Sequence, residues 1–82
     1  MGGRWLHSFD DMPAIDTPFE SYWYRFNKLH RDGDLPAETG MGRTIYYKNG
    51  YLHRTDGPSY ILRDHSDKVI VSNYYLNGIK II

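Results

Sequence analysis

Three histidines recur along the chain at a constant interval, and each is followed within four residues by an acid. The histidines are 23 residues apart, at His7, His30 and His53. The acids that follow them are Asp10 or Asp11, Asp34 and Asp56. An imidazole beside a carboxylate can act as a general base, and several imidazoles together can bind a metal.

The repetition of this His and Asp pair favours a structural role. Catalysis needs one distinctive site with a shifted pKa, whereas a residue that recurs in every repeat serves the folding of each repeat. We therefore expect each histidine ring to form a hydrogen bond with the turn that follows it. Contact of these histidines with a partner, and a small hydrolase that uses one His and Asp pair, are the alternatives.

Other chemical motifs are absent from the sequence. It has no glycine-rich phosphate loop, no paired nucleophile and base, and no cysteine for a disulfide or a thiolate metal site. We predict that the chain is not an enzyme and that it binds no cofactor and no metal. The lack of cysteine is typical of proteins of the reducing cytoplasm, so we expect a cytoplasmic location.

The histidines belong to a longer repeat of 23 residues. Each is preceded by leucine and followed by an acidic turn and then a proline, at Pro13, Pro36 and Pro58. Asn-Gly pairs lie before the third Leu-His and near the C-terminus, at Asn49-Gly50 and Asn77-Gly78. We predict that these acid, proline and Asn-Gly positions, like the histidines, form the scaffold of the repeat.

The Asn-Gly pairs predict β-hairpins. A two-residue type I′ turn needs positive φ at both of its positions, and asparagine and glycine tolerate such angles. If Asn49-Gly50 forms the tip, Lys48 pairs with Tyr51, and Tyr47 pairs with Leu52. The side chains of Tyr47 and Leu52 then lie on one face of the hairpin.

The alternation of hairpin tips and acidic turns predicts an all-β fold. We expect residues 1–82 to form a single domain of about three 23-residue repeats plus a C-terminal half repeat. The expected architecture is an antiparallel meander of repeated β-hairpins that forms one elongated twisted sheet, because each repeat must bury its aromatic face on its neighbours. Residues 14–21, the least regular stretch, could be an extended connection or a single helical turn.

Residues 47–54, which read Tyr-Lys-Asn-Gly-Tyr-Leu-His-Arg, resemble the MORN repeat. A MORN repeat is also 23 residues long and reads as an aromatic residue, any residue, Asn-Gly, two residues and His. The chain is more similar to a MORN-like variant of phages, giant viruses and some bacteria, in which Leu-His-Arg-x-Asp-x-Pro-Ala follows the Asn-Gly, and residues 44–61 match it cleanly. This resemblance implies a β-hairpin array with a binding role. It does not imply the lipid-binding or scaffolding roles of ordinary MORN proteins, whose His is followed by Gly rather than by Ser8, Arg31 or Arg54.

The overall charge disfavours some classes of partner. Basic and acidic residues both number 10, so no net field draws the chain to nucleic acid or to a membrane. Residues 1–41 hold seven acids and four bases, a net charge of −3, whereas residues 42–82 hold six bases and three acids, a net charge of +3. We therefore expect the partner to be another protein.

Three features are candidates for the protein-binding surface. The first two are an acidic patch and a set of tyrosines on a solvent-facing sheet face, with the residues Asp10, Asp11, Asp16, Glu20, Tyr22, Tyr24, Tyr46, Tyr51 and Tyr74. The third is the apolar last strand, residues 78–82. It could be buried in the monomer, or it could be a sheet edge that pairs with a partner or forms a homodimer.

Together, these observations and the MORN-like resemblance lead to one interpretation. The chain is a small non-enzymatic protein-binding module, a phage-type inhibitor or modulator that binds and blocks a host or bacterial defence protein. Its expected location is the cytoplasm, and the host cytoplasm if the protein is viral. An antitoxin or immunity protein that neutralises a cognate toxin is the alternative, because related repeats occur in bacterial antitoxins.

Overall fold

The computed structural model describes residues 6–81, and the regular secondary structure in this range consists of β-strands. The strand pairings are antiparallel, so the predicted all-β class is confirmed. Residues 1–5 and 82 of the expected single domain lie outside the described residues. Within the described range, no helix could cross a membrane.

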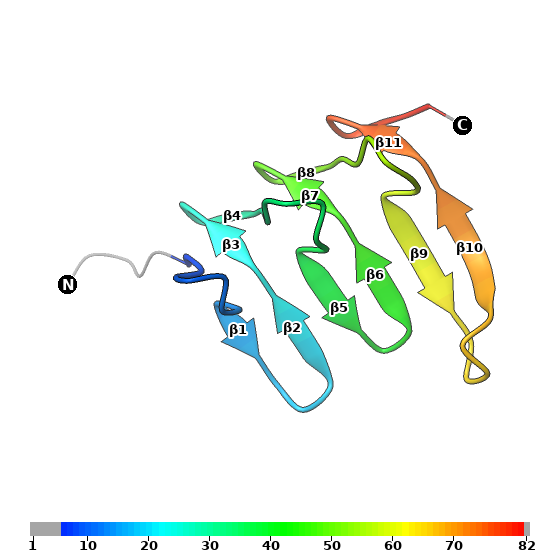
Figure 1. Ribbon diagram of the computed structural model, residues 1–82, viewed down its shortest axis with the longest axis horizontal. Helices are drawn as coiled ribbons and strands as arrows, with labels where there is room; N and C mark the ends of the chain where they lie inside the picture. Colours follow the sequence, from blue (N-terminus) through cyan, green and yellow to red (C-terminus); the bar gives the residue numbers. More distant parts are fainter. Residues whose placement is uncertain (1–5, 82) are drawn as a thin grey trace.

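The strands form two rows of hairpins (Figure 1). Three long hairpins join side by side into a six-stranded sheet in the order β1-β2-β5-β6-β9-β10. These strands are β1 (Ile15–Asp16), β2 (Glu20–Tyr22), β5 (Glu38–Gly40), β6 (Arg43–Ile45), β9 (Tyr60–Arg63) and β10 (Val69–Asn73). Three short hairpins continue from the long ones as separate two-stranded sheets. Their strands are β3 (Tyr24–Arg25), β4 (Lys28–Leu29), β7 (Tyr47–Lys48), β8 (Tyr51–Leu52), β11 (Tyr75–Leu76) and β12 (Ile79–Lys80).

The strands therefore do not form the one continuous sheet that the repeat led us to expect. We call the successive 23-residue repeats, residues 1–23, 24–46 and 47–69, the first, second and third units. A single aromatic residue joins the two rows of hairpins in each of the first two units. The N–H of Tyr46 donates to the carbonyl of Ser59 beside the six-stranded sheet, while its carbonyl accepts from the N–H of His53 in the short hairpin. Trp23 makes the equivalent bonds with Ala37 and His30. The chain leaves the six-stranded sheet at these residues because the N–H of each bonds in one row of hairpins and its carbonyl bonds in the other.

The tips of the short hairpins have the predicted geometry. Asn49 and Gly50 have φ angles of 51° and 85°, as a type I′ turn requires. The predicted register is confirmed, because Tyr47 pairs with Leu52 and Lys48 with Tyr51. The last hairpin repeats this tip at Asn77-Gly78, with φ angles of 49° and 82°. The first short hairpin places Phe26 and Asn27 at its tip instead, with φ angles of 46° and 67°.

A small core lies where the two rows meet. Its buried apolar residues are Trp23, Ala37, Ile45 and Ile61, and they are joined by His30 and Ser59. Ala37 and Ser59 are fully buried, and each directly follows a half-buried repeat proline. These small side chains lie where consecutive units meet, since the carbonyls of Ala37 and Ser59 accept from the N–H groups of Trp23 and Tyr46.

Residues 14–21 form the first long hairpin rather than a helical turn. The hairpin pairs Ile15 with Tyr22 and Asp16 with Ser21. Its turn is stabilised by the hydroxyl of Thr17, which accepts hydrogen bonds from the N–H groups of Phe19 and Glu20 at 3.3 and 3.0 Å. Local side-chain bonding of this kind favours a turn over a helix.

The C-terminal strand is not buried within the monomer, so that alternative is wrong. Ile79 and Ile81 are 69% and 50% exposed. The segment pairs with β11 in the last short hairpin, while the edge of the six-stranded sheet at this end is β10. The edge strand exposes Val69 and Ile70.

Candidate functional site

The repeat histidines fasten each unit to the tip of the next hairpin. Nδ1 of His30 accepts a hydrogen bond from the N–H of Asn49 at 2.9 Å. His53 bonds in the same way to Asn77, and His7 to Phe26, at 3.0 and 3.2 Å. The preceding leucine adds a second bond, as when the carbonyl of Leu29 accepts from the N–H of Gly50. The rings of His7 and His53 thus bond to the tip of the following hairpin, not to the turn after the histidine.

The arginine after the histidine makes a second link between units. Nε of Arg54 donates to the carboxylate of Asp34 at 2.9 Å, and its guanidinium lies 3.9 Å from the centre of the Tyr46 ring. Nη1 of Arg54 also donates to the carbonyl of Pro58 at 3.2 Å. The hydrogen bond from Arg54 lowers the pKa of Asp34 below its usual range. A charged pair stacked on a ring in this way stabilises the contact between units.

Arg31 repeats this arrangement one unit earlier. It binds the carboxylate of Asp11 through Nε and Nη2 at 2.9 and 3.0 Å, and its guanidinium lies 3.8 Å from the Trp23 ring centre. The hydrogen bond from Arg31 lowers the pKa of Asp11. The carbonyl of Asp11 accepts from Nε1 of Trp23 at 2.9 Å. Asp11, which we predicted as part of an acidic binding patch, is thus bonded to the next unit.

His30 differs from the other two repeat histidines. Only 4% of its surface is exposed, and its Nε2 lies 2.8 Å from Oδ1 of Asp32. Because Nδ1 already accepts the bond from Asn49, the hydrogen of the neutral ring is on Nε2, which donates to Asp32. Nη1 of Arg25 lies 4.0 Å from the other oxygen of Asp32. The hydrogen bond from His30, with a smaller contribution from the charge of Arg25, lowers the pKa of Asp32.

This bonding limits the acid-base chemistry of His30. Both ring nitrogens are occupied, so the ring has no free lone pair with which to take a proton from a substrate. Among the described residues, no three His, Cys, Asp or Glu side chains are grouped so that they could hold a metal ion. The arrangement is therefore suited to holding Asp32 and the Asn49 backbone in place.

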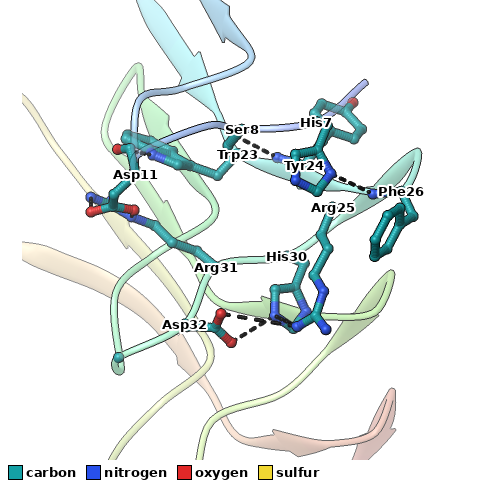
Figure 2. A pocket seen from close by; sticks show the side chains of 11 residues that line it. His7, Ser8, Asp11, Trp23, Tyr24, Arg25, Phe26, His30, Arg31 and Asp32 are labelled. Atoms are coloured by element: carbon teal, nitrogen blue, oxygen red, sulfur yellow. Dashed lines mark hydrogen bonds and ion pairs between the residues drawn. The ribbon is translucent and has the colours of Figure 1, made fainter. Parts of the chain in front are cut away.

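A hollow of about 550 Å³ opens between the first short hairpin and the turn at residues 31–33 (Figure 2). His7 and Phe26 lie at one side of it, and His30 and Asp32 lie at the other. Arg25 lies between them, with its guanidinium 5.8 Å from the centre of the Phe26 ring. The His7 ring centre lies 4.7 Å from that of Phe9 and 5.0 Å from that of Phe26. We call these three side chains the ring cluster; its two phenylalanines are 71% and 60% exposed.

A second hollow, of about 310 Å³, lies one unit further along. Its walls include Lys48, His53 and Thr55, which stand 23 residues after Arg25, His30 and Asp32. The two hollows share the turn that contains Asp32. The repeat therefore produces two adjacent hollows with related but different walls.

The four acids of the predicted acidic patch bond in different places. Asp11 binds Arg31, as described above. The carboxylate of Asp16 accepts a bond from the hydroxyl of Ser21 at 2.6 Å on β2. Glu20 pairs with Arg43 on the six-stranded sheet. Asp10 is exposed in the first turn, so the four do not act as one unpaired cluster.

Glu20 belongs to a small charged cluster that the sequence analysis missed. Arg43 lies between it and Glu38, with Nε of Arg43 3.1 Å from the Glu38 carboxylate. The hydroxyl of Tyr22 donates to Glu20 at 3.0 Å, and this bond raises the pKa of Tyr22. Burial raises the pKa of Glu38. The strand register could have indicated this cluster, because Gly40 pairs with Glu20 on one neighbouring strand and with Arg43 on the other.

Among the five predicted tyrosines, Tyr51 is the exposed one, at 60%. Its ring packs beside the tip of the last hairpin, since a Cβ at Gly78 would lie 3.0 Å from it. The other four are partly buried: Tyr22, Tyr24, Tyr46 and Tyr74. Tyr46 lies under Arg54, so much of this tyrosine set belongs to the packing between units.

The repeat positions that we assigned to the scaffold fall at turns and links. Asp34 and the three histidines bond between units, as described above, and the Asn-Gly pairs form the last two hairpin tips. Asp56 is exposed on the wall of the second hollow. The sequence offers no arginine to bind Asp56 as Arg54 binds Asp34. Arg54 stands four residues after Gly50, whereas Ile82 stands four residues after Gly78.

Comparison with known proteins returns no match among family models, curated proteins or solved structures. The geometry of the described residues therefore supplies the argument for function.

Proposed function

We propose that this chain is a non-enzymatic protein-binding module that acts by covering a surface of its partner. The observation that carries this proposal is the distribution of its apolar side chains. Four hydrophobic residues are buried, whereas eleven large ones in the described range are exposed. Grouped exposed apolar side chains mark protein interaction sites, because their burial against a partner removes them from water.

The ring cluster at the first hollow is the best place for such a contact. His7, Phe26 and the buried Trp23 line this hollow, and Phe9 packs against the His7 ring. Aromatic anchors beside a pocket are typical of the residues that dominate binding energy at protein interfaces. A partner segment with an apolar side chain would insert between the two phenylalanines and cover them.

The bonding of the repeat histidines supports a binding role over catalysis. The three rings hold hairpin tips, and the most buried of them, His30, has both nitrogens occupied. A hydrolase would need a histidine with a free nitrogen beside a substrate.

The MORN-like repeat pattern supports a phage-type origin, with a host or bacterial defence protein as the blocked partner. The absence of cysteine supports a cytoplasmic location. A homodimer is the alternative to a different partner protein, because Ile79 and Ile81 are exposed at the C-terminal end of the array. Sedimentation velocity at several protein concentrations separates a homodimer from a monomer that binds a different protein.

Capture from a bacterial lysate tests the proposed function. The tagged full chain is compared with Phe9→Ser/Phe26→Asn, which removes both rings of the cluster, and with Phe19→Ser. Phe19 is a matched control because it is also 71% exposed but lies in the tip of the first long hairpin. Mass spectrometry and stain intensity give the identity and stoichiometry of bound proteins.

We expect one protein in stoichiometric amount with the natural chain and with Phe19→Ser, and little with the double variant. Circular dichroism of each variant verifies that the fold is retained. Equal capture by all three forms would reject the ring cluster as the binding surface. Recovery of nucleic acid in place of a protein would reject the proposed function itself.

A further inference from the structure

The second unit contains a carboxylate bound by a basic residue and a histidine. Nε2 of His30 donates to Asp32 at 2.8 Å, and Arg25 lies 4.0 Å from the same carboxylate. Asn49 fixes the ring by donating to its Nδ1. This geometry amounts to a carboxylate-binding site that is filled by the chain itself.

The third unit repeats the site without the carboxylate. Lys48 and His53 stand 23 residues after Arg25 and His30, but Thr55 stands at the position of Asp32. Nδ1 of His53 accepts from the N–H of Asn77 at 3.0 Å, which again places the ring hydrogen on Nε2. The third unit therefore repeats the histidine that donates and the basic residue, but it lacks the carboxylate that accepts.

The acids around this position form no described bond with Lys48 or His53. Asp32 lines the same hollow and the charge of Lys48 contributes to lowering its pKa, but its hydrogen bond is with His30; Asp34 is held by Arg54. Asp56 lines the same hollow and is exposed. Within residues 6–81, no carboxylate lies within 4.0 Å of the Lys48 ammonium or forms a hydrogen bond with Nε2 of His53.

We propose that Lys48 and His53 bind an acidic side chain of the partner protein, in the place that Asp32 occupies one unit earlier. This proposal rests on the proposed protein-binding function. The ammonium of Lys48 supplies charge, and the Nε2–H of His53 supplies a directed hydrogen bond, so together they select a carboxylate. The site lies in the hollow next to the ring cluster, so one partner segment can place an apolar residue in the first hollow and an acid in the second.

Four single variants test the site, two of which exchange the residue types at positions 32 and 55. Thr55→Asp supplies the missing carboxylate from the chain itself, and Asp32→Thr removes the one that fills the earlier site. Lys48→Ala removes the cation, and Asp56→Asn removes an exposed acid that lines the same hollow. Each is made in the full chain, and thermal unfolding verifies that it folds.

The measurement is a titration of the full chain with sodium acetate, followed by the NMR resonances of the His30 and His53 rings. Sodium chloride at equal ionic strength is the reference. We expect a saturable shift of His53 with acetate, a roughly tenfold weaker response in Lys48→Ala and Thr55→Asp, and a new response of His30 in Asp32→Thr. Asp56→Asn should respond at least as strongly as the natural chain.

Several results would overturn the proposal. These are the absence of a saturable His53 response, an equal response in Thr55→Asp, or a response that appears only in Asp56→Asn, which would mean that Asp56 fills the site. N-acetyl-aspartate N-methylamide and N-acetyl-alanine separate a side-chain carboxylate from a chain terminus. Tighter binding of the first is expected, and tighter binding of the second would reject an acidic side chain.

This titration needs no partner, so its outcome is independent of capture from a lysate. If acetate binds and no protein is captured, the site stands and the proposed function fails. If a partner is captured and acetate does not bind, the protein-binding function stands without this contact.

Discussion

Arg54 donates two hydrogen bonds to the carboxylate of Asp34, from Nε at 2.9 Å and from Nη2 at 3.3 Å. The two residues are 20 positions apart and belong to consecutive units, as do Arg31 and Asp11. Each arginine also covers an aromatic ring at the joint between the two rows of hairpins. The array is therefore stabilised by bonds between units in addition to its small core.

Replacement of Arg54 by Lys should destabilise the fold, although it keeps the charge. A lysine cannot span both oxygens of Asp34 while lying flat on Tyr46. We expect the free energy of unfolding in urea to fall by about 0.5–1 kcal/mol from the lost stacking alone. Arg63→Lys is the control, because the described partners of Arg63 are Thr44 and Asp67. An equal loss in both variants would show that the stacked geometry has no special role.

His30→Ala should cost more stability than His53→Ala. His30 is 4% exposed, so its removal leaves the N–H of Asn49 and the carboxylate of Asp32 without their partner. We expect a loss of about 2 kcal/mol for His30→Ala, which removes a buried ring with two hydrogen bonds, and about 1 kcal/mol for His53→Ala, which removes a half-buried ring with one described bond. Chemical denaturation monitored by tryptophan fluorescence gives both values. A larger loss for His53→Ala would contradict the role assigned to burial.

Acid should weaken the fold through its bonded aspartates. Hydrogen bonds from Arg31, His30 and Arg54 lower the pKa values of Asp11, Asp32 and Asp34 below their ordinary value of 3.8. As pH falls, the unfolded chain therefore takes up these protons first, and protonation favours unfolding. The stabilisation is complete above the ordinary aspartate pKa and is lost as pH falls through the lowered values.

Thermal unfolding measured between about pH 6 and about pH 2 tests this expectation. The midpoint should fall most steeply below about pH 4, and Asp34→Asn should make that fall shallower. Asp10→Asn, which replaces an exposed acid with the same φ angle of 54° as Asp34, serves as the control. Glu38 contributes with the opposite sign, because burial raises its pKa and its protonation relieves that cost. An unchanged slope in Asp34→Asn would reject the ion pair as a source of acid sensitivity.

Phe26→Asn should stabilise the first short hairpin. Phe26 has a φ of 46°, a conformation that costs roughly 1–2 kcal/mol for most residues and less for asparagine. We expect a gain of up to about 1 kcal/mol in the free energy of unfolding, reduced by loss of the ring contact with His7. Asn49→Phe, the reverse change at the equivalent tip, should destabilise. A loss of stability in Phe26→Asn would mean that the ring contact outweighs the backbone strain.

That Phe26 occupies a strained tip is informative about its role. An aromatic residue at a position where asparagine is better suited sacrifices stability, and such departures from local preference are expected at functional positions. The same residue is 60% exposed beside the first hollow. A more stable Phe26→Asn that also loses the captured partner would connect the strain directly to binding.

The hairpin tips and their register could be predicted from the sequence because they depend on neighbouring residues. Positive φ at Asn49 and Gly50 follows from their backbone preferences, and a two-residue turn then fixes the pairing of Tyr47 with Leu52. The 23-residue period likewise predicted that the histidines recur in equivalent places.

The ion pairs between units were harder to predict, although the spacing that indicates them is present in the sequence. Arg31 and Arg54 are 23 residues apart, and so are Asp11 and Asp34, which leaves a constant separation of 20 between each pair. Reading that separation as an ion pair requires knowing that the turn of one unit lies beside the arginine of the next. For this reason Asp11 was predicted as part of a free acidic patch.

Local turn chemistry and the repeat period thus specify the all-β class, the hairpin tips and the equivalence of the repeats. The division into two rows, the burial of His30 and the two adjacent hollows follow from how consecutive units pack. Packing distinguishes residues that the period makes equivalent: Asp32 fills the site beside His30, and Thr55 leaves the site beside His53 open. These differences depend on contacts between residues about 20 positions apart, whose free energies a local pattern does not contain.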